Sequence, residues 1–591
     1  MKKKLVWLIL SCLMVAALVL ASCAPAVIEE EEEVVIEEEE EVVIEEEEEE
    51  VLLPPEVPKY GGVLTFGLGG EGNLGFDPSI SYEWNCHAVQ YTNEELLVGD
   101  YAKGPTGSGE TRWFGMGFTP QFETGALAES WEFPDPDTIT FHIREGVLWQ
   151  DKPPVNGREL VAEDVAFSIT REFETVGSYI NATYGGWFKS AEATDKYTVV
   201  VKGEDSDMYR TAVVFEYIAD TLPIVAPEVI EQYGDMRDWR NVVGTGPFIL
   251  VDIVEGSSAL LKKNPNYWGK DPLHPENQLP YLDAIKMHII PDTSTMMAAL
   301  RTAKIDQLYG VSWEQGESLL ATNPELKSVR ELDYVGWHIF MKSGTEPYDD
   351  IRVRRALAMA VDQQTIAEEY YGGNAAVLAW PTSAETPQIY IPLDQLPEST
   401  RELFEYHPDK ARQLLAEAGY PDGFKAKVVC YTGVADMLSM VQSYWADIGV
   451  ELEIESKDWG TFVSKRAARD YELFYGFAGA LGVEYKLLYV KPEAVYNNSL
   501  HDDPYFNERY DKIWAWESIG NQDLRDGAMI EVVTYYLDQA WAVQTPVAYI
   551  YSLWWPWVQN YAGVHSVGYN NQAGWAIWVW YDQALKKSMG Y

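Results

Sequence analysis

Apolar and polar residues alternate strictly in two short segments of the chain. In residues 139–144, Ile-Thr-Phe-His-Ile-Arg, an apolar side chain occupies every second position, and residues 450–455, Val-Glu-Leu-Glu-Ile-Glu, repeat the pattern. Successive side chains of a strand point to opposite faces of its sheet. The alternation therefore predicts two strands, each with one buried and one exposed face.

Two other segments carry apolar residues at the spacing of a helix. Residues 353–361 and 411–418 place apolar side chains three or four positions apart, which puts them on one helical face. Asp349 or Asp350 is positioned to cap the first helix, and Asp409 opens the second. Strand and helix patterns alternate in this way after the first 58 residues, without a low-complexity linker between them. We therefore expect a mixed α/β fold whose domains interrupt one another in sequence.

The first residues have the layout of an export signal. Lys2 to Lys4 precede an apolar run from Leu5 to Leu20, and two small residues separate that run from Cys23. This order is typical of a cleaved secretory signal, and the run is shorter than the roughly 20 residues that a membrane span needs. The last four residues of the segment resemble the lipobox of bacterial lipoproteins, which predicts a signal peptide over residues 1–22 and lipid attachment at Cys23. The alternative is an uncleaved anchor with an incidental cysteine.

A glutamate-rich repeat follows the predicted signal. Residues 29–50 hold 16 glutamates in three blocks, each preceded by a short Val/Ile run. Like charges repel one another and extend a chain, so we expect residues 23–58 to be a lipidated cysteine followed by a disordered acidic tether. The whole chain carries a net charge of −49, and −33 remains without these glutamates. Because phosphates bind cationic surfaces, this acidity excludes nucleic acid as a partner.

The composition of the chain indicates a folded protein, and its motifs do not favour an enzyme. Apolar residues make up 47% and aromatic residues 13% of its 591 residues, which rules out a largely disordered chain. Four cysteines and eight histidines are too scattered for a disulfide framework or a metal cluster. Residues 70–75 match G-x-G-x-x-G, but Asp77 and Pro78 follow where a dinucleotide-binding helix would have to begin. We expect no enzyme, no cofactor and no metal, with a secreted hydrolase as a distant alternative.

Six blocks in order resemble one family, the extracytoplasmic solute-binding proteins of family 5, which serve oligopeptide, dipeptide and nickel ABC importers. The resemblance covers residue 59 to the C-terminus. It is carried by residues 61–66 with Asp77-Pro78, by 127–131 with 140–147 and 162–165, and by 244–248, 264–269, 350–357 and 408–420.

Several of these blocks also have a plain structural interpretation. Glycine and proline in residues 244–248 and 264–269 supply turns and packing, so we expect them to belong to the scaffold. Arg352, Arg354 and Arg355 are expected on the solvated face of their helix.

The resemblance implies a two-lobed, periplasmic-binding-protein-like α/β fold, of type II and cluster C, that closes about a hinge on its ligand. Domain I would comprise residues 59–100, 241–320 and 541–591, with domain II, the extra domain of the same lobe, at 101–240. Domain III would form the other lobe from residues 321–540. A solute that contacts both lobes stabilises the closed form, and a permease recognises that form.

The resemblance also indicates candidate contacts to the solute. The family's aspartate for a peptide α-ammonium is absent from residues 473–484, so Glu484 is the candidate substitute. Tyr82, Trp84 and Asn85 follow the Asp77-Pro78 loop, which faces the cleft in the family. Five further aromatic residues complete the candidate set: Trp337, Trp459, Phe477, Trp554 and Trp555. An indole offers apolar contact and one N–H donor to a side chain or to a sugar ring.

Together these features predict the substrate-binding lipoprotein of an ABC importer. We expect a monomer that is anchored outside the cytoplasm, at the cell surface or in the periplasm, and that serves a permease and its ATPase. The expected solute is a peptide or a similar amine-bearing compound, and an oligosaccharide is the alternative.

Overall fold

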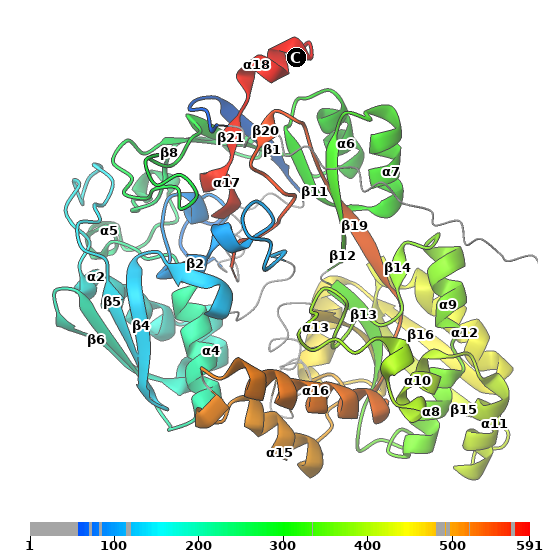
Figure 1. Cartoon of the computed structure of the whole chain (residues 1–591). Helices are drawn as coiled ribbons and strands as arrows, with labels where there is room; N and C mark the ends of the chain where they lie inside the picture. The colour runs from blue at the N-terminus through cyan, green and yellow to red at the C-terminus, as the bar shows by residue number, and fades with distance from the viewer. Residues whose placement is uncertain are drawn as a thin grey trace, which may run out of the picture. The chain divides into compact units, whose positions relative to one another are not determined.

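A computed structural model describes residues 57–69, 74–81, 86–113, 120–333, 335–479, 491, 494, 497–518, 520–568 and 574–591. The region from Pro58 to Tyr591 forms one compact unit. The predicted signal peptide, Cys23 and the tether up to residue 56 lie outside the described residues. The expected mixed α/β architecture is confirmed, because strands and helices alternate along the chain (Figure 1). The strands form three larger sheets.

The first sheet has eight strands, in the order β12-β19-β11-β1-β10-β9-β8, and β14 pairs with β19. Strand β1 runs parallel to both β10 and β11, and the other pairs are antiparallel. The strands are β1 (Val63–Leu68), β8 (Phe248–Val254), β9 (Ser258–Lys263), β10 (Ala284–Ile289), β11 (Gln307–Ser312), β12 (Lys327–Leu332), β14 (Ala375–Ala376) and β19 (Val547–Trp554). Helices α6 (Thr293–Arg301) and α7 (Trp313–Thr322) connect its strands.

Shorter elements complete this lobe. Two small antiparallel pairs join β2 (Leu97–Gly99) to β3 (Glu123–Gly125) and β20 (Val558–Gln559) to β21 (Trp580–Tyr581). Helices α17 (Gly574–Trp578) and α18 (Gln583–Ser588) lie at the end of the chain.

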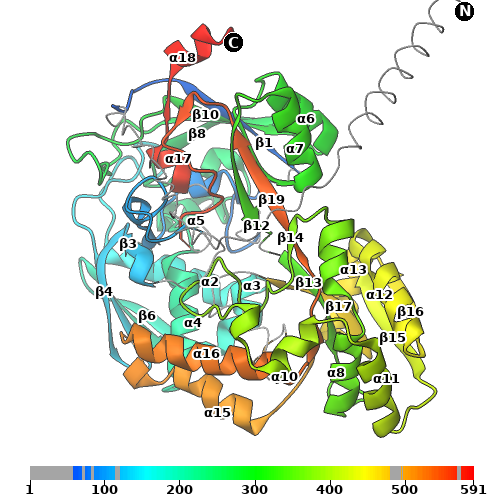
Figure 2. The same cartoon turned by 45° about the vertical axis from the view of Figure 1, so that its right-hand side comes forward.

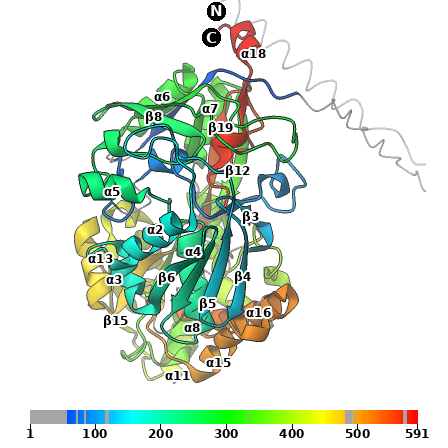
Figure 3. The same cartoon turned by 90° about the vertical axis from the view of Figure 1, so that its left-hand side faces the viewer.

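A four-stranded antiparallel sheet, in the order β4-β5-β7-β6, is formed between β3 and β8 in the sequence. Its strands are β4 (Ala128–Asp135), β5 (Thr138–Ile143), β6 (Phe188–Asp195) and β7 (Thr198–Gly203), and its helices are α2 (Ala162–Glu174), α3 (Tyr179–Tyr184), α4 (Met208–Ala219) and α5 (Pro227–Tyr233). Figure 3 shows this sheet with α4 packed beside β5. Phe215 of α4 stacks on Phe141 of β5, with ring centroids 5.8 Å apart and 3° between the planes.

Strand β5 confirms the predicted strand and keeps most of its alternation. The apolar side of the pattern is buried, and His142 on the polar side is partly exposed. Thr140, also on the polar side, is buried, so the exposed face is smaller than expected. Lys202 on β7 covers part of that face, since its ammonium donates to the Thr138 hydroxyl.

A five-stranded sheet, in the order β16-β15-β17-β13-β18, forms the core of the other lobe. Its strands are β13 (Val335–Met341), β15 (Phe424–Tyr431), β16 (Val450–Lys457), β17 (Leu473–Gly479) and β18 (Ala542–Val543). The helices of this part, several of which appear in Figure 2, are α8 (Ile351–Met359), α9 (Gln363–Thr365), α10 (Glu398–Arg401), α11 (Pro408–Glu417), α12 (Asp436–Asp447), α13 (Trp459–Ala468), α15 (Pro504–Ile513) and α16 (Gln522–Asp538). Strand β16 lies at the edge and keeps the predicted alternation of buried and exposed residues over its first half.

Both predicted helices are present. Asp350 caps α8, since its carboxylate accepts from the backbone N–H of Arg352 at 2.8 Å. In α11 the first residue is Pro408, so Asp409 lies within the first turn and does not cap the helix. Proline fits this position because the first helical N–H has no partner inside the helix.

The arginines of α8 depart from expectation. The side chain of Arg352 is half exposed, but Arg354 is buried and donates to the carbonyl oxygens of Tyr348 and Gln539 at 2.9 Å. Arg355 pairs with Glu402 and Asp538. The expectation of a solvated face is therefore wrong for Arg354 and Arg355, because α16 and the segments around α10 pack against that side of the helix.

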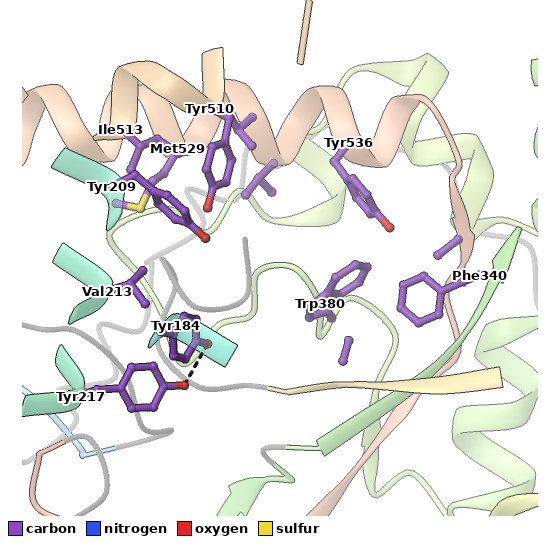
Figure 4. Close-up of a cluster of buried hydrophobic side chains, with 14 of the residues drawn as sticks. Tyr184, Tyr209, Val213, Tyr217, Phe340, Trp380, Tyr510, Ile513, Met529 and Tyr536 are labelled. Carbon is purple, nitrogen blue, oxygen red and sulfur yellow. Dashed lines mark hydrogen bonds between the residues drawn. The ribbon is translucent and has the colours of Figure 1, made fainter. Parts of the chain in front are cut away.

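Two short links join the first and the five-stranded sheet, in addition to the longer connections to and from β14. Strand β12 of the first sheet ends at Leu332 and β13 of the other begins at Val335, and β18 returns to β19 over three residues. One hydrophobic cluster also continues from α4 into α15 and α16. Figure 4 shows Tyr209 of α4 beside Tyr510 of α15, and their ring centroids lie 6.1 Å apart. The domain boundaries expected from the sequence stay a prediction.

Candidate functional site

A cavity of about 600 Å³ lies in the first lobe, beside the carboxyl ends of the neighbouring parallel strands β1 and β10. Open α/β sheets characteristically bind ligands in the crevice outside such strand ends. The walls come from the end of β1, the start of α6, strand β11 and three segments distant in sequence. They include Phe66, Gly67, His87, Gln90, Tyr91, Met296, Gln307, Tyr309, Gln315, Tyr561, His565 and Trp575.

The described walls of this cavity contain no aspartate, glutamate, lysine or arginine. Their polar groups are amides, hydroxyls and two imidazoles. The ring of His565 stacks on that of Tyr309, with centroids 4.1 Å apart and 20° between the planes. Burial lowers the pKa of His565 to about 4, and His87 acts in the same direction. The imidazole of His565 is therefore neutral near pH 7, and the cavity offers aromatic surface and uncharged hydrogen-bonding groups.

Tyr309 connects the cavity to a carboxylate on β12. Its side chain hydrogen-bonds with Glu331, which lowers the pKa of that carboxyl, but burial outweighs this effect and raises the pKa to about 7. The nearby charges of Glu385 and Asp333 act in the same direction as burial. Burial likewise raises the pKa of Asp333 to about 6. Two carboxyl groups near the crossing between the sheets are thus poised to change charge around neutral pH.

Four of the predicted contacts, Tyr82, Trp84, Asn85 and Glu484, lie outside the described residues. The other five are aromatic, and none of them lines the 600 Å³ cavity. They divide into a group of three, on β13, β17 and α13, and a pair at the end of β19.

Trp337, Trp459 and Phe477 lie together, so the fold unites positions up to 140 residues apart. The ring centroid of Phe477 is 5.8 Å from that of Trp337 and 6.0 Å from that of Trp459. Trp459 begins α13, where Asp458 caps the helix by accepting from the Thr461 N–H at 3.0 Å. The side chain of Trp459 is 49% exposed. This group, the aromatic trio, can therefore present an indole face to a solute.

Trp554 and Trp555 belong to the core of the first lobe. Trp554 is buried and packs edge-on against Tyr561, a wall residue of the cavity, with centroids 5.1 Å apart. Trp555 is fully buried, stacks on Trp557 and donates its indole N–H to the Leu300 carbonyl at 2.9 Å. Trp554 thus supports a cavity wall from behind, and Trp555 serves packing.

Sequence reasoning missed the residues that line the cavity. Three of them, Gln307, Tyr309 and Gln315, lie where strand β11 is followed by the start of α7. Strand ends are a general signal for ligand sites. His565 and Trp575 carry no local signal, because only tertiary folding brings the C-terminal segment to β1.

Within the described part of the chain, no group of three or more His, Cys, Asp or Glu side chains could hold a metal ion. None of the described helices is both long and apolar enough to span a bilayer.

Comparison with known proteins places this chain in a family. Residues 124–482 match the family model described as "Bacterial extracellular solute-binding proteins, family 5 Middle". Among curated proteins, heme-binding protein A of Haemophilus influenzae is 28% identical over 445 residues, which cover 69% of this chain and 72% of that protein. The dipeptide-binding protein of Escherichia coli is 28% identical over 381 residues, covering 60% of this chain and 68% of that protein.

Solved structures agree on the fold. The periplasmic binding protein DppA from Helicobacter pylori, solved in complex with the peptide STSA, superposes with a TM-score of 0.66 at 22% identity. The match covers 89% of this chain and 99% of DppA. The expected two-lobed binding-protein fold is thereby confirmed. Members of this family bind solutes outside the cytoplasm for transport and are not enzymes, and this chain belongs to the bacterial extracellular solute-binding proteins of family 5.

Proposed function

We propose that this protein is the substrate-binding component of an ABC importer, that it binds a peptide between two lobes, and that it delivers the peptide to a permease and its ATPase. The observation that carries the proposal is the 600 Å³ cavity at the ends of β1 and β10 in a chain of this family. The dipeptide-binding relative and the peptide complex of DppA support a peptide as the solute. The walls of the 600 Å³ cavity carry amide and hydroxyl groups, which suit the peptide groups of a solute because these both donate and accept hydrogen bonds.

We take the two short links between the sheets as the hinge about which the lobes close. A solute that contacts the cavity and the aromatic trio together stabilises the closed form by its differential affinity for that form. We take domain I as residues 59–100, 241–320 and 541–591, domain II as 101–240 and domain III as 321–540. The permease would recognise the closed arrangement of these domains.

The ammonium group of a peptide requires an acceptor. Glu484 is the candidate from the sequence, and Glu331 is a second candidate, because it hydrogen-bonds with the cavity residue Tyr309. A carboxylate shielded from water binds an ammonium group more strongly than one on the surface. The aromatic trio supports the alternative solute, an oligosaccharide, since indole faces pack against sugar rings.

The mature protein would be held at the outer face of a membrane. The lipobox-like segment supports signal-peptide removal after residue 22 and lipid attachment at Cys23. Residues 24–58 would then tether a monomeric receptor to the cell surface or to a membrane of the periplasm. Mass spectrometry of the mature N-terminus would detect acyl chains on Cys23.

Calorimetry of the purified chain tests the solute class. Titration with di- to pentapeptides should give saturable binding with one site per chain, and β-linked oligosaccharides should give none. Thr293, an exposed residue at the cavity edge, supplies a blocking variant. Thr293→Trp should abolish peptide binding, whereas Thr293→Ser should retain it, and Glu484→Gln and Glu331→Gln should show which carboxylate receives the ammonium group. Saturable oligosaccharide binding without peptide binding would select the alternative solute.

A further inference from the structure

A second cavity, of about 260 Å³, lies in the first lobe. It is enclosed by the 93–101 segment that contains β2, by β3, by residues 267–279 and by the end of α17. Gln90 is the only described residue that lines both cavities. The two cavities therefore share one wall residue, and the peptide site proposed above uses the larger one.

Two indole rings form the aromatic walls of the second cavity. Trp268 and Trp578 are both half-buried. Tyr101 stacks on Trp578 with centroids 5.3 Å apart and 7° between the planes. The guanidinium carbon of Arg144 lies 4.5 Å from the ring centroid of Trp268. Because neighbours hold both rings in place, they offer pre-formed flat surfaces to an occupant.

Carboxylates supply the acceptors of this cavity. Glu94 accepts from the Tyr267 hydroxyl at 3.0 Å and from the indole N–H of Trp268 at 3.0 and 3.1 Å. Burial raises the pKa of Glu94, while these hydrogen bonds and Arg144 oppose the shift. Glu95, whose residue is only 3% exposed, and Asp100 also line the cavity. A folded chain keeps carboxylates so enclosed only where donors surround them.

Cationic donors balance these acceptors. Arg144 is fixed by hydrogen bonds to the carbonyl oxygens of Ala126 at 2.9 Å and Gly125 at 3.1 Å. Lys270, together with Thr124, is exposed at the edge of the cavity. The walls thus combine donors, acceptors and flat aromatic surface within a small volume.

We propose that this second cavity binds a single-ring polyhydroxyl solute, of the size and chemistry of a monosaccharide. A sugar hydroxyl both donates and accepts, which matches walls that carry both kinds of group. The C–H groups of a sugar ring carry a slight positive charge and pack on the negative face of an indole. The volume also fits, because cavities for drug-sized ligands begin at roughly 300 Å³.

Other occupants fit the walls less well. An organic cation would meet the carboxylates but would be opposed by Arg144 and Lys270. An anion would meet three carboxylates, Glu94, Glu95 and Asp100, and would be repelled by them. A purely apolar ring would leave the polar groups of the walls without hydrogen bonds to water.

Calorimetry of the full chain with D-glucose, D-galactose, N-acetyl-D-glucosamine and myo-inositol tests the proposal. At least one of the four should bind saturably at one site per chain. Trp578→Leu removes the aromatic face but keeps apolar bulk, and should weaken this binding roughly fivefold or more. The matched Trp578→Phe variant keeps an aromatic face and should lose less affinity. Glu94→Gln should weaken binding by roughly tenfold, because it removes a charged acceptor.

Two blocking variants assign the binding to one cavity. Thr124→Trp, at the edge of the second cavity, should abolish sugar binding and leave peptide binding unchanged, while Thr124→Ser should change neither. Thr293→Trp, at the edge of the first cavity, should abolish peptide binding and leave sugar binding unchanged. If none of the four compounds binds, or if Thr293→Trp abolishes their binding and Thr124→Trp does not, the proposal is wrong. Saturable binding of butylamine, with no sugar bound, would also overturn it. Since Thr124 is exposed, its variants decide the question even if a Trp578 variant fails to fold.

Discussion

Arg171 and Asp77 form a buried bidentate ion pair. The two terminal nitrogens of the guanidinium donate to the two carboxylate oxygens at 2.9 and 2.7 Å. The Asp77 carboxylate also accepts from the backbone N–H groups of Ser79 and Met236 at 3.1 and 2.9 Å. This one side chain therefore joins the loop after β1 to α2 and to the segment after α5, and every oxygen of the carboxylate is used.

Asp77→Asn should destabilise the protein by about 3–5 kcal/mol, because it leaves the guanidinium of Arg171 buried without its counter-charge. Urea unfolding followed by tryptophan fluorescence measures the change. Asp409→Asn is the matched control, since Asp409 pairs with Arg412 but its side chain is 97% exposed. The control should change the free energy of unfolding by less than about 1 kcal/mol. Equal effects of the two substitutions would contradict the assigned role of Asp77.

Asp306 should be a second point of high sensitivity in the first lobe. Its buried carboxylate accepts from the Thr65 backbone N–H at 2.7 Å and from the Trp557 indole and the Tyr581 hydroxyl at 2.8 Å each. Asp306→Asn should lower the free energy of unfolding by about 3 kcal/mol, since several hydrogen bonds to a charged acceptor weaken together. Tyr581→Phe removes one of these bonds and should cost about 1 kcal/mol. A Tyr581→Phe variant as unstable as Asp306→Asn would contradict this account, because one hydrogen bond would then carry the whole effect.

Glu331 should make stability fall as pH rises. Its folded pKa of about 7 lies above the value of an unfolded glutamate, so the folded state holds the proton to higher pH. The contribution is fully present below about pH 4 and is lost as pH rises through about 7, with a magnitude on the order of 3 kcal/mol. Chemical denaturation of the wild type and of Glu331→Gln between pH 4 and 8 measures this slope.

Comparing wild type with Glu331→Gln separates the effect of Glu331 on stability from the opposite effect of His338. Burial lowers the pKa of His338 to about 3, so that residue makes stability rise with pH up to the range where an unfolded histidine titrates. The difference between wild type and Glu331→Gln cancels the His338 contribution. Parallel stability curves for the two proteins would show that Glu331 titrates normally.

Replacing Trp459 should reduce the affinity for the solute more than it reduces the stability of the fold. Its indole is half exposed, and its ring stacks on Phe477 in the aromatic trio. Trp459→Ala should weaken solute binding roughly tenfold and cost only about 1 kcal/mol of stability. Trp516, which is 43% exposed and lies outside the trio, supplies the control. A solute affinity unchanged in Trp459→Ala would remove the trio from the binding site.

The glycines of residues 244–248 show what a sequence block can indicate and what only the tertiary structure reveals. Gly244 and Gly246 were expected as scaffold, and the structure gives the reason. A Cβ atom would lie 1.8 Å from the Thr92 carbonyl oxygen at Gly244 and 2.8 Å from it at Gly246. The backbone N–H of Gly246 donates to that same oxygen at 2.8 Å. The glycines thus permit a close approach of two chain segments, which a sequence motif can indicate but whose partner it cannot name.

Local patterns determined the α/β class, the half-buried strand β16, the capped start of α8 and the family of the chain. Each depends on interactions within a few residues, or on short blocks in a fixed order, and both are visible in the sequence. Tertiary structure alone decided that Arg354 is buried, that Trp555 packs in the core, and that Tyr309 and His565 face one cavity. These outcomes depend on contacts between residues as much as 256 positions apart, as for Tyr309 and His565. Burial, the resulting pKa shifts and the shape of a cavity arise only when such distant segments exclude water together.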